Sequence, residues 1–165
     1  MNVHASPYLT RQAAEQAVGM ALPMMEQAVK DPVIGARGFL YIVVMDPSMG
    51  PAMAEFEEAI LYEHAIGDTS QWDVDYAGQA RAKAHRCWRA GTDTQAAQET
   101  RPYLLIAKDT ARRGSTVLDG IIVGVSGANP WYDEAFAGCV AICLRAIALG
   151  PARAMPAQPS NVQVV

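Results

Sequence analysis

The stretch 118–135, which reads LDGIIVGVSGANPWYDEA, decides the fold that this sequence is expected to adopt. Near its start, Asp119 and Gly120 stand between two apolar runs, and Asp-Gly in that setting is among the strongest local signals for a β-hairpin. The pattern therefore predicts two antiparallel strands, over residues 115–118 and 121–125.

The second half of the same stretch predicts the start of a helix. Asn129 and Pro130 are residues typical of a helix N-terminus, and Asp133 and Glu134 follow within the first turns, where the helix dipole favours negative charge. The apolar residues after them predict a helix over 131–149. The hairpin is therefore expected to lead directly into a long apolar helix.

Outward from that stretch, helical and extended patterns alternate. Apolar residues at helical spacing predict helices over 9–30 and 73–90, and a β-branched apolar run predicts a buried strand over 39–45. Residues 56–64 are interpreted as a second, more exposed strand, although residues 52–63 fit a helix as well. Helices at both ends, with two hairpins and a helix between them, indicate an α+β protein in which helices cover an antiparallel sheet.

Length and composition restrict the functional classes. The chain has 165 residues, of which 51% are hydrophobic and 18% charged, with a formal net charge of −4. This length fits a single domain, expected over residues 1–150, and the Pro- and Ala-rich residues 151–165 are expected to form a tail that is flexible or docked on a partner. The acidic balance argues against nucleic-acid binding.

The cellular setting is inferred from two features. No secretory signal is visible near Arg11, and the most apolar stretch, from Ala135 to Leu144, is too short to span a bilayer. We therefore expect a cytoplasmic protein without a membrane partner. The low charged fraction suggests that part of the surface is covered in a homo-oligomer.

The hairpin and the helix after it resemble the GlcG/HbpS family, which includes the C-terminal domain of PduO-type proteins. That family typically has a turn glycine, then Gly-Val-Ser-Gly at the end of the hairpin, then an acidic pair opening the last helix. Its other landmark is Ala-x-x-Lys-Ala on a helix. The matching residues are Gly120, Gly124, Val125, Ser126, Gly127, Asp133 and Glu134, together with Ala80, Lys83 and Ala84.

The resemblance covers roughly residues 10–150 and implies several properties. The fold would be profilin-like, with a five-stranded antiparallel sheet covered by helices. Relatives commonly form dimers or higher oligomers, often octamers. Some bind haem, and some belong to operons for small-molecule catabolism. This sequence departs from the family in a longer, more acidic stretch over 46–76, and in His85, Arg86 and Cys87 where Arg-Thr-Ala is usual.

Five basic or titratable side chains are concentrated in nine residues of the expected helix over 73–90. One interpretation is a solvated basic face that pairs with the excess acids of the chain. The other is that Lys83 and Arg86, which share a stripe near the apolar face, line a cleft for an anion such as a carboxylate or a haem propionate. The cluster consists of Arg81, Lys83, His85, Arg86 and Arg89.

Other residues extend this candidate pocket. Arg112 precedes the hairpin and could close the pocket or stand in solvent, while the glycines of the hairpin permit close approach of the backbone to a ligand or a neighbouring element. If Glu134 faces Lys83, the two could act as acid and base. The candidate ligand-binding residues are Arg86, Arg112, His85, Ser126, Gly127 and Tyr132.

Two functions are carried forward. The main interpretation is an enzyme of a catabolic pathway that acts on a carboxylate-bearing metabolite without an organic cofactor, by hydrolysis, deamination or isomerisation. Its candidate catalytic residues are Lys83, Glu134, His64 and Asp133. The alternative is a protein that binds haem or another planar ligand, with His64 or His85 as the iron ligand. Either function implies a small anionic molecule as partner, and no metal site is expected apart from a haem iron.

Overall fold

The computed structural model describes residues 6–154 except residues 36, 110 and 111. Four strands form one antiparallel sheet in the order β2-β1-β4-β3. Their bounds are Leu40–Met45 (β1), Ile60–Ile66 (β2), Ser115–Leu118 (β3) and Ile121–Ser126 (β4). The β3–β4 hairpin turns at Asp119 and Gly120, which both have positive φ, so the Asp-Gly prediction is confirmed.

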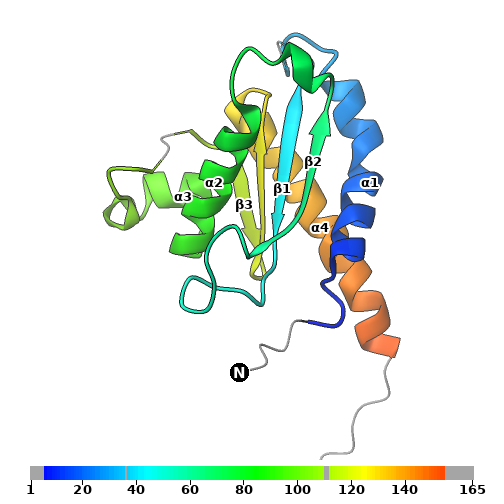
Figure 1. Cartoon of the computed structure of the whole chain (residues 1–165), viewed down its shortest axis with the longest axis vertical. Helices are drawn as coiled ribbons and strands as arrows, with labels where there is room; N and C mark the ends of the chain where they lie inside the picture. Colours follow the sequence, from blue (N-terminus) through cyan, green and yellow to red (C-terminus); the bar gives the residue numbers. More distant parts are fainter. Residues whose placement is uncertain (1–5, 36, 110–111, 155–165) are drawn as a thin grey trace, which may run out of the picture.

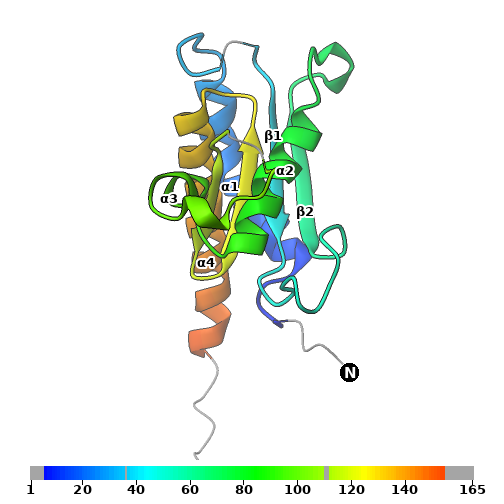
Figure 2. The ribbon, with the colours of Figure 1, turned by 90° about the vertical axis from the view of Figure 1, so that its left-hand side faces the viewer.

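Helices cover both faces of the sheet (Figure 1). One face carries α1 and α4, which lie side by side, and the other carries α2 with the short α3 (Figure 2). The helices are α1 (Arg11–Ala28), α2 (Tyr76–Ala90), α3 (Thr94–Glu99) and α4 (Pro130–Ala154), with 3-10 turns at η1 (Thr69–Gln71) and η2 (Pro102–Leu104). The chain is therefore an α+β protein with a helix–sheet–helix arrangement.

The alternation of side chains along β1 divides the core into two parts. Ile42 and Val44 pack under α1 and α4, whereas Val43 and Met45 pack under α2. Successive residues of a strand point to opposite faces, so an uninterrupted apolar strand is expected where both faces are covered. The buried run predicted over 39–45 reflects this central position.

Two predicted elements differ from the structure. The resemblance implied five strands, but four are found in the described part of the chain. Between α3 and β3, the described residues 100–109 contain the 3-10 turn η2 and no strand: Pro102 opens the turn, and Arg89 donates to the Leu104 carbonyl oxygen at 3.1 Å. The second strand begins at Ile60 rather than at residue 56, and the residues before it form turns, neither strand nor helix.

Helix α4 is longer than predicted because it continues through Gly150 and Pro151 to Ala154. Its 25 residues make it long and apolar enough, by length and composition alone, to cross a membrane. A core helix passes the same test, and α4 does pack on β3, β4 and α1. Of the expected tail, residues 151–154 belong to α4, and residues 155–165 lie outside the described residues.

Candidate functional site

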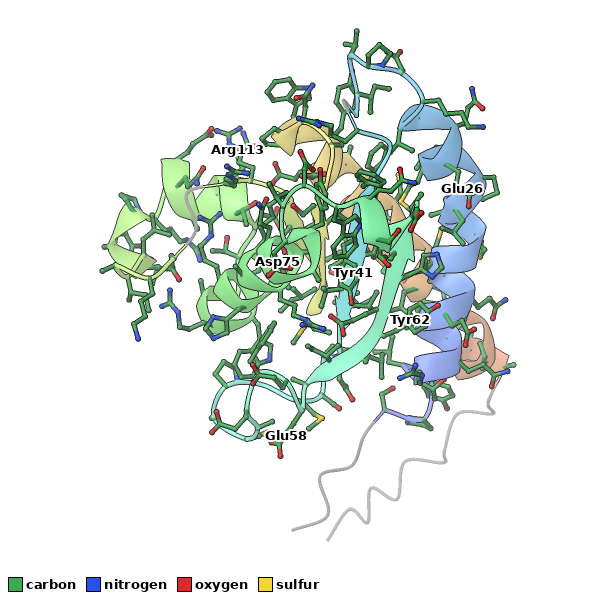
Figure 3. All side chains as sticks on the ribbon, turned by 45° about the horizontal axis from the view of Figure 1, so that its top comes forward. Glu26, Tyr41, Glu58, Tyr62, Asp75 and Arg113 are labelled. Carbon is green, nitrogen blue, oxygen red and sulfur yellow. The ribbon has the colours of Figure 1, made fainter. Side chains whose placement is uncertain are left out.

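The candidate site is built around Lys83, in the middle of α2. This helix begins after Asp75 (labelled in Figure 3), whose carboxylate accepts from the Gly78 amide at 2.8 Å. Lys83 points from α2 toward the end of β4, and its side chain is only 2% exposed. Its Nζ donates to the Val125 carbonyl oxygen at 2.8 Å and to Asp133 Oδ2 at 2.7 Å.

Asp133 approaches Lys83 from the first turns of α4. Its other carboxylate oxygen, Oδ1, accepts from the Ala128 amide at 2.8 Å, so one side chain both caps the helix start and binds the lysine. Gly114 packs against this pair with φ +129°, and a Cβ there would lie 2.7 Å from Lys83 Nζ. The ion pair therefore depends on a position that only glycine fits without strain.

Burial perturbs both members of the pair. Loss of solvent lowers the pKa of Lys83, and Arg112 and Arg86 lower it further, although Asp133 acts in the opposite direction. Loss of solvent also raises the pKa of Asp133 to about 6, against the attraction of Lys83. The two pKa values are thus drawn toward each other, which eases proton transfer between the two groups.

A cavity of about 310 Å³ opens at this pair, where β4 ends and α4 begins. We call it the Lys83 cavity. Among the described residues that line it, three side chains are cationic and two are acidic, in a chain whose net charge is −4. Its lining consists of Arg37, Asp73, Val74, Tyr76, Gln79, Lys83, Arg112, Ser126, Gly127, Ala128, Pro130 and Asp133.

Hydrogen bonds organise the rim of the Lys83 cavity. Gln79 Oε1 accepts from Arg112 Nη1 at 3.1 Å and from Ser126 Oγ at 3.2 Å, so one amide joins α2, β4 and the loop before β3. On the opposite side, Asp73 lies 3.2 Å from Arg37. Arg112 and Arg37 are exposed and lie at the mouth of the cavity, whereas Lys83 is buried at its floor.

The structure brings together five residues that the sequence had proposed: Lys83, Arg112, Ser126, Gly127 and Asp133. The lining residues that sequence reasoning did not select for the pocket include Gln79, Arg37 and Asp73. Gln79 lies one helical turn before Lys83, and that spacing was the one available signal for it. Arg37 and Asp73 come from loops and belong to no motif.

Three of the predicted residues lie elsewhere. Glu134 does not face Lys83, because adjacent helical residues point about 100° apart and Asp133 takes that position. Tyr132 packs beside Phe136 in the core under α1 and α4. Arg86 is 1% exposed and lies under the loop before β3, with Nη2 3.4 Å from the Arg112 carbonyl oxygen, and it does not line the Lys83 cavity.

The two candidate histidines lie apart from the Lys83 cavity and from each other. His64 is opposite Ile42 in the β1–β2 register, and directly opposite residues share a face of the sheet. It therefore faces α1, where its Nδ1 lies 3.3 Å from Tyr62 Oη. His85 points to the other side of α2 from Lys83, because residues two apart on a helix are separated by about 200°.

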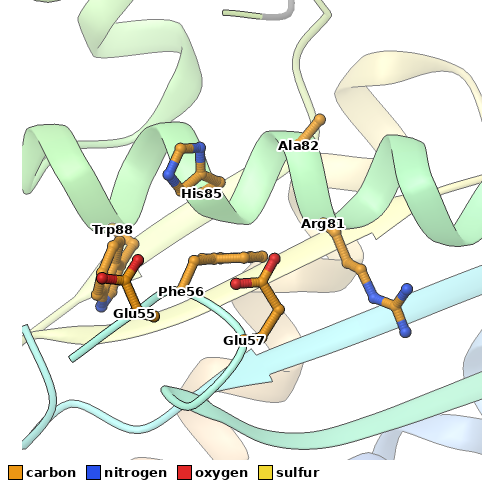
Figure 4. Close-up of a pocket in the computed structure, with 7 residues that line it drawn as sticks. All are labelled: Glu55, Phe56, Glu57, Arg81, Ala82, His85 and Trp88. Carbon is orange, nitrogen blue, oxygen red and sulfur yellow. The ribbon is translucent and has the colours of Figure 1, made fainter. Parts of the chain in front are cut away.

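His85 lines a second cavity, of about 350 Å³, between α2 and the loop that joins β1 to β2 (Figure 4). Its ring contacts those of Phe56 and Trp88, with centroids 4.8 and 6.0 Å away. Glu55 and Glu57 also line this cavity. In the described part of the chain, no group of three His, Cys, Asp or Glu side chains could hold a metal ion.

These positions can be compared with what haem requires. An axial nitrogen is offered by His85, in a cavity whose charged lining residues are Glu55, Glu57 and Arg81; the two glutamates would repel the propionates, whereas Arg81 would attract them. The cations that suit a propionate, Lys83 and Arg112, line a cavity that contains no histidine among its described residues. The His85 cavity therefore offers an axial nitrogen together with one cation, Arg81, which is already paired with Glu63, while the larger group of cations lies in the Lys83 cavity.

Fold and site together define an α+β protein with a ligand-sized cavity of excess positive charge at the end of its sheet. No family model and no curated protein matches the sequence. The structure resembles that of HbpS, with a TM-score of 0.54 and 20% identity over 83% of this chain and 90% of HbpS.

Two further structures match. The Klebsiella pneumoniae protein ORFY, described by the family model DUF336, has a TM-score of 0.53 and 16% identity over 83% of this chain and 90% of its own. A PduOC–haem complex has a TM-score of 0.47 and 13% identity over 79% of this chain and 91% of its own. The chain has the fold of HbpS and ORFY, which is the GlcG/HbpS-like fold that the sequence resemblance implied.

Proposed function

We propose that this protein binds a small carboxylate-bearing molecule in the Lys83 cavity. One observation carries the proposal: three cations from three separate parts of the chain converge on one cavity of about 310 Å³, where only two acids oppose them. They are Arg37 before β1, Lys83 on α2 and Arg112 before β3. Guanidinium groups bind carboxylates with paired, charge-assisted hydrogen bonds.

The start of α4 also favours a negatively charged ligand. Pro130, its first residue, lines the cavity, so the positive end of the 25-residue helix dipole lies beside the three cations. A compact anion is also consistent with the cavity volume, which falls at the lower end of the range for small-molecule sites. Binding is proposed as the primary role of the cavity.

Calorimetry with a series of small carboxylates, from acetate to succinate, tests the proposal. We expect saturable binding that weakens at least tenfold in Arg112→Gln. The matched control is Arg113→Gln, since Arg113 is the neighbouring residue, pairs with the exposed Glu99 and does not line the cavity. Equal binding by both variants, or no binding of any carboxylate by the unaltered protein, would overturn the proposal.

Haem is the second candidate, favoured by the GlcG/HbpS resemblance and by the imidazole of His85 between aromatic rings. A Soret band that appears on haem addition and is lost in His85→Ala, but kept in His64→Ala, would support it. A haem spectrum unchanged by the protein would exclude it. Because His85 lies outside the Lys83 cavity, the Arg112→Gln comparison and the haem titration report on different sites.

A further inference from the structure

The floor of the Lys83 cavity combines an amine and an acid in the arrangement that imine formation needs. Lys83 Nζ is 2.7 Å from Asp133 Oδ2, and both residues line the cavity. We propose that Lys83 forms a reversible Schiff base with a 2-oxo acid bound in the Lys83 cavity. This inference rests on the proposed function and names the class of ligand that the site takes.

The first requirement of a Schiff base is a neutral amine. An exposed lysine is protonated at neutral pH and does not attack a carbonyl, whereas burial and neighbouring cations make a lysine a nucleophile. Lys83 is buried, and that burial is the main cause that lowers its pKa; Asp133 opposes the shift, and Arg112 and Arg86 add smaller contributions in the lowering direction. The other lysines of the chain, Lys30 and Lys108, are exposed.

The second requirement is an acid that can move protons at the reacting nitrogen. Asp133 is suited to this role because its carboxyl group is buried against Lys83 and has a raised pKa. Gly114 contributes by its lack of a side chain, since even a Cβ there would lie 2.7 Å from the nitrogen. The amine and the acid are thus held together at the cavity floor by three segments of the chain.

Atoms and protons balance in the proposed step. The Lys83 ammonium gives a proton to the Asp133 carboxylate, and the free amine attacks the carbonyl carbon of the ligand to form a carbinolamine. Asp133 then protonates the hydroxyl group, which leaves as water. The product is a protonated Schiff base on Lys83 beside the Asp133 carboxylate, so the charge of the pair is the same before and after.

The cations at the mouth of the cavity select the class of carbonyl compound. A 2-oxo acid has a carboxylate next to its carbonyl, so the carboxylate can bind Arg112 while the carbonyl faces Lys83. Arg112 is fixed by its 3.1 Å hydrogen bond to Gln79, one helical turn before Lys83 on α2. A simple ketone or aldehyde lacks the group that Arg112 and Arg37 would bind.

Borohydride trapping tests the inference with the unaltered full chain. Pyruvate or glyoxylate is added, the imine is reduced with sodium borohydride, and the modified lysine is identified by peptide mass spectrometry. We expect a stable secondary amine on Lys83 and at least tenfold less on Lys30 and Lys108, which serve as exposed controls within the same molecule. Labelling of Lys83 no higher than that of the exposed lysines would overturn the inference.

Two further measurements separate this inference from the proposed function. Propionate, which has a carboxylate but no oxo group, should bind by calorimetry, give no adduct and protect Lys83 from pyruvate. In Asp133→Asn, the rate of trapping should fall at least tenfold. If propionate and pyruvate bind but no adduct forms on Lys83, the Schiff base is wrong and carboxylate binding stands; if neither binds, both are wrong.

Discussion

Lys83 Nζ and Asp133 Oδ2 lie 2.7 Å apart although the two residues are 50 positions apart in the sequence. Lys83 belongs to α2 and Asp133 to α4, which cover opposite faces of the sheet, so the ion pair joins the two helical layers around the end of β4. A buried pair of this kind orients neighbouring groups more than it stabilises the fold, because desolvation of both charges opposes their attraction.

Removing the charge of Lys83 alone should therefore be costly. In Lys83→Met, the Asp133 carboxylate stays buried without its cation, and we expect the free energy of unfolding to fall by about 3–5 kcal/mol. The loss should be smaller at pH 5 than at pH 8, because the variant lacks the lysine that lowers the Asp133 pKa, and the buried carboxyl group is then neutral at pH 5. Urea unfolding at the two pH values measures both effects.

Two controls show whether the unpaired charge is the cause. Lys108→Met removes an exposed lysine and should change the free energy of unfolding by no more than about 0.5 kcal/mol. The double variant Lys83→Met with Asp133→Leu removes both charges and should recover most of the stability that Lys83→Met loses. A double variant as unstable as Lys83→Met would mean that lost packing, not the buried charge, causes the effect.

The raised pKa of Asp133 predicts a specific dependence of stability on pH. Between the unfolded value of 3.8 and the folded value of about 6, the native protein holds a proton that the unfolded chain does not. The contribution of this group to the free energy of unfolding is therefore complete below about pH 4 and is lost as pH rises to about 6. Relative to Asp133→Asn, the unaltered protein should lose stability over this interval, as measured by urea unfolding at several pH values; a constant difference would contradict the assignment.

Much of the site could be predicted from the sequence because local patterns fix it. The hairpin signal places Ser126 and Gly127 at the end of a strand, and the Ala-x-x-Lys-Ala motif places Lys83 on the helix packed against that strand. The expected close approach at Gly124 is confirmed, since a Cβ there would lie 2.6 Å from the Ala80 carbonyl oxygen. The hairpin and the close approach at Gly124 follow from short-range chemistry, whereas the Ala-x-x-Lys-Ala motif was given by the family resemblance.

The rest depends on geometry that no short pattern carries. The residue at which α4 begins decides which of the two acids, Asp133 or Glu134, contacts Lys83. If the helix were shifted by one residue, Glu134 would take the position of Asp133. Arg37 and Asp73 reach the cavity from loops whose positions depend on the packing of the whole sheet. The position of Arg86 outside the cavity was missed for the same reason, because the loop that covers it has no periodicity.

Self-association, expected from the low charged fraction, stays a prediction. We expect the contact between copies to form on the layer of α1 and α4. On the helices of this layer, Met20 is 56% exposed and Ile142 is 54% exposed, so a contact between copies through this layer would cover both side chains. We expect light scattering to give a multiple of 17.7 kDa and Ile142→Glu to lower it. Glu57→Gln, beside α2, is the control; a mass of 17.7 kDa for the unaltered protein would contradict the prediction.

Two glycine substitutions should have opposite effects on stability. In Gly124→Ala, the new methyl group would lie 2.6 Å from the Ala80 carbonyl oxygen and 2.9 Å from Ala84 Cβ, so β4 and α2 must separate. We expect the free energy of unfolding to fall by about 1–3 kcal/mol. Gly138 is inside α4, where the nearest atom to a new Cβ is Thr116 Oγ1 at 4.0 Å.

Gly138→Ala should therefore raise the free energy of unfolding by about 0.5–1 kcal/mol, because alanine loses less backbone entropy than glycine in a helix. The same methyl group is added in both variants, so opposite signs would separate the steric clash at Gly124 from the gain in backbone entropy at Gly138. Urea unfolding of both variants and of the unaltered protein shows whether each substitution raises or lowers the free energy of unfolding. A stable Gly124→Ala would mean that α2 does not lie as close to β4 as the hydrogen bond from Lys83 to the Val125 carbonyl oxygen requires, since Lys83 follows Ala80 by about one turn on that helix.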